Sequence, residues 1–136
     1  LCIFTFSIFT RMTIDIKIGI GEALDRVSIL EIKLINIKDE VKSHNIKKEY
    51  DYLISVLQPI EELAGTKLLY DSLCDVNSRL WEVEDLLRIL EKKNDFNEEF
   101  INLARSVYKL NDERAELKKR INILYGSEFL EEKSYK

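Results

Sequence analysis

The sequence predicts an all-α fold, either an antiparallel helical bundle or a long helical hairpin, with a short N-terminal β-strand. Two observations lead to this prediction. Apolar residues recur three and four positions apart over long segments, which is the period of helices that pack on one another. Short stretches containing Gly, Asn or Pro separate these segments, and short connections favour antiparallel neighbours. With 136 residues, the chain has the length of a single domain.

The N-terminal segment divides into two parts. Residues 1–11 form an apolar run that is shorter than the roughly 18 residues of a membrane-spanning helix. The run also lacks the basic start and cleavage site of a signal peptide. Met12 is the only methionine, so we expect translation to start there and residues 12–136 to form the helical domain. Residues 13–20 alternate between apolar and polar, which predicts a half-buried strand. Such a strand must pair with residues 1–9 or a partner chain, or be covered by a helix.

The first two helices are predicted from residue 21 to about residue 60. The first runs from Gly21 to about Lys42, and its apolar stripe is Leu24, Val27, Leu30, Leu34, Ile37 and Val41. Residues 43–45 indicate a break, with Asn45 as the N-cap of the second helix. That helix is expected to bend or restart at Pro59, the only proline.

The third and fourth helices carry the clearest pattern. Gly65 and Thr66 are expected to end one helix and to cap the next. The third helix then presents an unbroken seam at Leu69, Leu73, Val76, Leu80, Val83, Leu87 and Leu90. A turn at residues 94–97 follows, in which Asp95 and Glu98 resemble a capping box. The fourth helix ends at Gly126, and its seam is Phe100, Leu103, Val107, Leu110, Arg114, Leu117, Ile121 and Leu124. One seam position is therefore an arginine.

These stripes predict how the helices associate. We expect a bundle built mainly from the first, third and fourth helices. Helices of about 25 residues span roughly 35–40 Å, and a molecule of those proportions has difficulty closing its own core. We therefore expect a homodimer or another protein partner.

Composition excludes several classes of function. The 21 basic and 25 acidic residues are interspersed, without the basic face of a nucleic-acid-binding protein. His44 is the only histidine, and the two cysteines, Cys2 and Cys74, do not stand at ligand spacing. Zinc and histidine-based triads are therefore not expected, and no cofactor is predicted. Both thiols are expected to be free, which favours a cytoplasmic protein.

Arg114 points to the residues that could carry chemistry. A buried unpaired charge costs several kcal/mol, so this arginine must have a partner. Glu84 and Asp85 are the candidates on the third helix, where they can also pair with Arg88. The complete set of candidate ligand-binding residues is Glu22, Arg26, Lys33, Glu84, Asp85, Arg88, Arg105, Tyr108, Asp112 and Arg114.

This set has two interpretations. It can be a salt-bridge network that sets the register of the bundle, because structural ion pairs shift the pKa values of charged residues as active sites do. It can also surround a pocket for an anionic ligand, because the guanidinium group suits carboxylate or phosphate. Gly19 and Gly21 before a helix suggest an anion-binding turn, but the third glycine and the lysine of known phosphate loops are missing.

Four blocks of the sequence resemble a known family. They are GEALDRVSILEIK at 21–33, LWEVEDLLR at 80–88, FINLARSVYKLNDERAELKKRIN at 100–122 and GSEFLEEKSY at 126–135. Together they resemble a small bacterial and phage family that is known as a domain of unknown function. In that family the first block has Lys and Thr where this chain has Arg26 and Ser28. The resemblance implies no activity. The charged tail at 131–135 could fold back over the polar cluster, although a frayed end is the usual behaviour of a terminus.

Two hypotheses of function remain from the sequence. The first is a non-enzymatic helical interaction or scaffolding module, dimeric and without affinity for nucleic acid or membranes. The second is a binding protein or small enzyme for a phosphorylated or carboxylated metabolite, held by the Arg, Lys, Glu and Asp cluster between helices.

Overall fold

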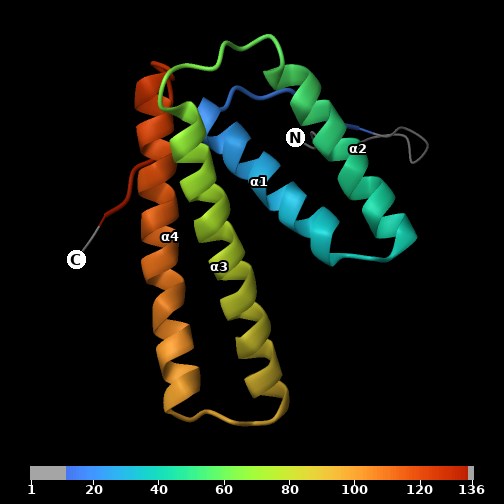
Figure 1. The fold of residues 1–136 in the computed structure, drawn as a ribbon, viewed down its shortest axis with the longest axis vertical. Coiled ribbons are helices and arrows are strands. Elements are labelled where there is room, and N and C mark those ends of the chain that lie inside the picture. The colour runs from blue at the N-terminus through green and yellow to red at the C-terminus, as the bar shows by residue number, and fades with distance from the viewer. Residues whose placement is uncertain (1–11, 135–136) are drawn as a thin grey trace, which may run out of the picture.

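The fold consists of four α-helices in a computed structural model that describes residues 12–134. The helices are α1 (Ile20–Asn36), α2 (Glu40–Leu57), α3 (Thr66–Lys92) and α4 (Glu98–Leu124). Helices α3 and α4 lie side by side as a long antiparallel hairpin (Figure 1). α1 packs on both of them at the end away from their connecting turn, and among the described helices α2 contacts α1 only. The all-α prediction is confirmed, as is a core built from the first, third and fourth helices.

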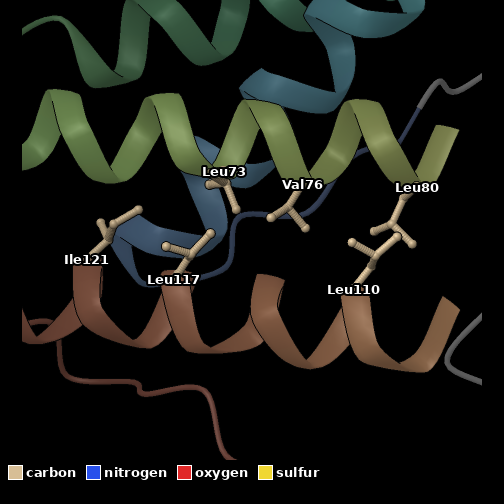
Figure 2. Close-up of a cluster of buried hydrophobic side chains, with 6 residues drawn as sticks. All are labelled: Leu73, Val76, Leu80, Leu110, Leu117 and Ile121. Carbon is tan, nitrogen blue, oxygen red and sulfur yellow. The ribbon is translucent and has the colours of Figure 1, made fainter. Parts of the chain in front are cut away.

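The α3–α4 seam forms the core that the sequence predicts. Figure 2 shows the side chains of α3 and α4 pointing toward one another, and the six buried residues are Leu73, Val76, Leu80, Leu110, Leu117 and Ile121. Leu69, Val83 and Val107 extend this cluster with partly buried side chains. Burying a Leu or Ile side chain contributes roughly 1.5–3 kcal/mol, so this seam is a main source of stability.

The break between the first two helices was predicted at the wrong place. α1 ends at Asn36, and residues 43–45 lie inside α2. Asp39 is the N-cap of α2, where its carboxylate accepts a hydrogen bond from the Lys42 N–H at 2.9 Å. A carboxylate at this position satisfies an N–H group that has no partner within the helix. α2 then ends at Leu57, two residues before Pro59.

Two predicted caps also need correction. Gly65 has φ +94° and is the N-cap residue of α3, so Thr66 is the first residue of that helix and not its cap. A positive φ explains the glycine, because an L side chain would be strained there. For α4 the N-cap is Asn97, whose side chain accepts the Phe100 N–H at 3.0 Å, and not Asp95.

The N-terminal strand has no counterpart among the described residues. Residues 13–19 form neither helix nor strand, and α1 begins at Ile20. Ile14 and Ile16 are exposed, so no covering helix buries them. A strand needs a neighbour for its backbone hydrogen bonds. Residues 1–9, which were predicted as one such neighbour, lie outside the described part of the chain, as does the whole of the segment 1–11.

The apolar stretches of the helices are short and interrupted by charges. Within residues 12–134, no helix combines the length and the apolar character that crossing a bilayer requires.

Candidate functional site

Arg114 finds its partner on α1. Its guanidinium Nε donates to Asp25 Oδ1 at 2.9 Å, and a second nitrogen, Nη2, donates to Asp25 Oδ2. Asp25 is 1% exposed, whereas the Arg114 side chain is 28% exposed. The hydrogen bonds to Asp25 raise the pKa of Arg114 despite its burial. The predicted partners on α3 are therefore wrong, and the pair joins the first helix to the fourth.

Two further polar side chains complete the contacts of Asp25. The Asn77 amide of α3 donates to Asp25 Oδ1 at 2.9 Å and to Ser28 Oγ at 2.7 Å. The Ser28 hydroxyl donates to the Asp25 backbone carbonyl at 2.7 Å. No buried side-chain N or O atom of residues 12–134 lacks a hydrogen-bond partner. We call Asp25, Ser28, Asn77 and Arg114 the central network. It connects α1, α3 and α4, and satisfied networks of this kind favour one arrangement of the helices.

A second charged group lies closer to the N-terminus of α1. Lys118 is buried and pairs with Glu22 at 2.6 Å and with Glu131 at 3.0 Å, and Glu22 also pairs with Arg26 at 3.1 Å. Burial alone would raise the pKa of Glu22, but Lys118 and Arg26 together lower it. Burial alone would lower the pKa of Lys118, and its two carboxylates raise it instead. Both groups are therefore held in their charged forms.

The first two N–H groups of α1 are occupied by side chains from the end of α4 and beyond. Gly21 donates its N–H to Asn122 Oδ1 at 2.7 Å, and Ile20 donates to Ser127 Oγ at 3.3 Å. A Cβ atom at Gly21 would overlap the Lys118 carbonyl oxygen. Glycine is therefore needed here for close packing of α1 against α4. The geometry does not support the anion-binding turn considered from the sequence.

The C-terminal tail lies along α4. Beyond the Glu131–Lys118 pair, Lys133 contacts Asp112 at 2.6 Å, and Glu132 contacts Lys119 at 3.3 Å. The tail therefore folds back over one side of the Lys118 group. This is the first of the two possibilities considered from the sequence, the other being a frayed end. The pairs of Lys119 and Lys133 are exposed, and each contributes at most about 1 kcal/mol.

The structure brings together only part of the predicted set. Glu22, Arg26 and Arg114 lie in or beside the two groups, and Asp112 holds the tail. Arg88 instead pairs with Glu84 and Asp85 on the exposed surface of α3, at 3.6 and 3.7 Å. Arg105 and Tyr108 are exposed on the part of α4 beyond α1, and Lys33 lies near the other end of α1. Glu84 does line a small cleft of about 140 Å³ with Arg114 and Trp81.

Sequence reasoning missed Asp25, Ser28, Asn77, Lys118 and Asn122, and it considered Glu131 only as part of the charged tail. A signal for most of them exists. Each of Asn77, Lys118 and Asn122 stands one position after a seam residue, and one residue along a helix is a rotation of about 100°. These positions therefore form a second stripe beside the seam, which faces α1. On α1, Gly21, Asp25, Ser28 and Ile32 are spaced by four, three and four, and all are buried.

The chemistry available to these groups is limited. Each carboxylate of the central network and of the Lys118 group faces a cation that already pairs with it. Within residues 12–134, no three His, Cys, Asp or Glu side chains are placed to hold a metal ion. The arrangement is suited to locking α1 onto the hairpin.

The chain was compared with models of known protein families. A model described as a family of unknown function (DUF6165) matches residues 14–136. The chain belongs to this family. The DUF6165 match spans all four helices and the tail, and therefore both charged groups. Comparisons with curated proteins and with solved structures gave no match.

Proposed function

We propose that this DUF6165 protein is a non-enzymatic helical interaction module that self-associates through its α3–α4 hairpin. The observation that carries the proposal is a row of exposed apolar residues on the hairpin, on the face opposite α1. These are Leu68, Leu86, Ile89 and Ile123, each between 44% and 76% exposed. We call this surface the open hairpin face.

The position of this face follows from the helical period. Each of the four residues stands one position before a seam residue, whereas Asn77, Lys118 and Asn122, which contact α1, stand one position after. The two sets therefore lie on opposite sides of the seam. Among the described helices, α1 alone packs on the hairpin. Arg79 and Glu113 also precede seam residues, and they pair across the hairpin at 3.7 Å on this face.

The size of the face suits a second copy of the chain. Helices α3 and α4 each have 27 residues. A two-helix surface of that length is about 40 Å by 20 Å, or about 800 Å², the area per partner of a standard interface. Leu68 and Ile123 lie at one end, with Leu86 and Ile89 toward the other. A two-fold axis across the face would bring the two ends together, which makes the contact self-complementary.

The second hypothesis, binding of a phosphorylated or carboxylated metabolite, has less support. Arg26, Arg88, Arg114 and Lys118 each already pair with at least one carboxylate. An incoming anion would have to displace these partners, and at Arg114 it would leave Asp25 buried without its cation.

The mass of the protein in solution tests the proposal. Native mass spectrometry and light scattering should give about twice the 16.0 kDa chain mass at micromolar concentrations. The double variant Leu86→Glu/Ile89→Glu should be a monomer with unchanged helicity, because it places charges on the open hairpin face. Ile101→Glu is the matched control. Ile101 is also about half exposed at the same end of the hairpin, but it follows a seam residue and so lies on the other side. This variant should remain a dimer.

Two outcomes contradict the proposal. A wild-type chain that stays monomeric at several hundred micromolar rules out a second copy as the partner. A dimer that Ile101→Glu dissociates, and that Leu86→Glu/Ile89→Glu leaves intact, uses the α1 side of the hairpin instead.

A further inference from the structure

A cavity of about 510 Å³ lies between α1, α2, the connection at 58–65 and the start of α3. Most of its wall is apolar, and the apolar lining consists of Ile20, Leu24, Val27, Ile54, Leu57 and Ile60. The volume lies in the range of about 300–1,000 Å³ that is typical of small-molecule sites. Water in such a space finds few hydrogen-bond partners. An apolar molecule that displaces this water is therefore stabilised.

Glu31 places a carboxylate in this wall. Its two oxygens accept hydrogen bonds from the hydroxyl groups of Tyr50 at 3.3 Å and Tyr70 at 2.9 Å. Burial and the nearby Glu31 charge raise the pKa of both tyrosines, so they remain protonated donors. Among residues 12–134, no lysine or arginine forms an ion pair with Glu31. The carboxylate is thus oriented, and each oxygen keeps a lone pair for a further donor.

The other charged residues around the cavity do not neutralise Glu31. Lys67 is the one cation of the lining, and it pairs with Asp71 at 2.8 Å. Glu62 adds a further carboxylate. Three carboxylates and one ammonium leave the cavity with a net charge of −2. The rings of Tyr70 and Tyr125 also line it, and aromatic faces attract cations.

We infer that this cavity binds an organic cation, an amine with an apolar body whose ammonium group pairs with Glu31. The inference goes beyond the proposed function and is independent of it, because the cavity lies on the α1 side of the hairpin. The apolar wall supplies the affinity for the body of the ligand. The uncompensated carboxylate selects the sign of its charge.

Three probes of matched length test this inference with the intact protein. They are octylammonium chloride, 1-octanol and sodium octanoate, each titrated by calorimetry below its aggregation concentration. Octylammonium should bind at least tenfold more tightly than 1-octanol, and octanoate should bind most weakly. The Glu31→Gln variant keeps acceptor and shape but loses the charge. It should lose most of the preference for octylammonium over 1-octanol, with the affinity for 1-octanol unchanged.

Two control variants make the result specific. Glu82→Gln removes an exposed carboxylate of α3 that does not line the cavity, and it should change neither affinity. Ile54→Asn places a polar side chain in the apolar wall at a residue that is 40% exposed, so folding should survive. It should weaken the binding of octylammonium and the binding of 1-octanol to the same extent. The inference is overturned if none of the three probes binds, if 1-octanol or octanoate binds as tightly as octylammonium, or if Glu31→Gln keeps the preference. Should Glu31→Gln fail to fold, the ranking of the three probes on the wild-type protein decides.

Discussion

The contact between Arg114 and Asp25 can be tested by replacing the arginine with the residue type that the seam otherwise prefers. Arg114→Leu removes two donors from a carboxylate that is 1% exposed and leaves Asn77 as its side-chain donor. Breaking a buried pair in this way costs about 3–5 kcal/mol. With a urea m-value of about 2 kcal/mol/M, a loss of 4 kcal/mol lowers the unfolding midpoint by about 2 M.

Two companion variants separate the buried charge from the change in packing. Asp25→Asn/Arg114→Leu removes both charges, so it should recover at least half of the stability that Arg114→Leu loses. Arg88→Leu is the matched control, because its ion pairs with Glu84 and Asp85 are exposed and should be worth less than about 1 kcal/mol. Urea unfolding followed by circular dichroism measures all three. If Arg114→Leu loses no more stability than Arg88→Leu, the central network does not lock the helices.

Three further predictions concern the start of α1 and the end of α4. Gly21→Ala should lower the free energy of unfolding by about 1–3 kcal/mol, because its Cβ would push α1 away from the Lys118 backbone; an unchanged urea midpoint would contradict this close approach. The folded-state pKa of Glu22 is lowered from 4.5, so its contribution to stability is present above pH 4.5 and is lost as the pH falls below it. Glu22→Gln should therefore be less stable than wild type at pH 7, and the difference should shrink in acid unfolding curves; a constant difference would argue against the pairing with Lys118. The Tyr125 hydroxyl accepts the Leu63 N–H at 3.2 Å, so Tyr125→Phe should cost about 1 kcal/mol and speed hydrogen exchange at the Leu63 amide. Exchange that is unchanged there would mean that the hydroxyl does not hold the 58–65 connection.

Much of the fold could be predicted because its signals are local. The seam residues of α3 and α4 recur with the helical period, and this pattern alone predicted two long helices and the face on which they meet. The end of α4 was predicted at Gly126, which has φ +62°, and the helix ends two residues earlier, at Leu124. The boundary between α1 and α2 was missed because the apolar spacing continues across it. The apolar stripe gives no sign that α1 ends at Asn36, although Asp39 caps α2 three residues later.

The candidate site was predicted less completely. Charged residues three or four apart can be paired from the sequence, and the pairs of Glu22 with Arg26 and of Arg88 with Glu84 and Asp85 were found in this way. Each of these residues lies within one helix turn of its partner. Lys118 was missed because it is not a seam residue, and its position matters only once α1 is packed beside it.

The sequence by itself determined that this chain is helical, that α3 and α4 share an apolar seam, and that the arginine in that seam must be paired. Only the tertiary structure decided the partner. Asp25 lies 89 positions away, on a helix whose placement depends on glycine contacts and on hydrogen bonds across three helices. Periodicity reports which side of a helix is buried, because that depends on the geometry of one helix. The choice of partner depends on how separate helices pack in space, and local spacing contains no record of that.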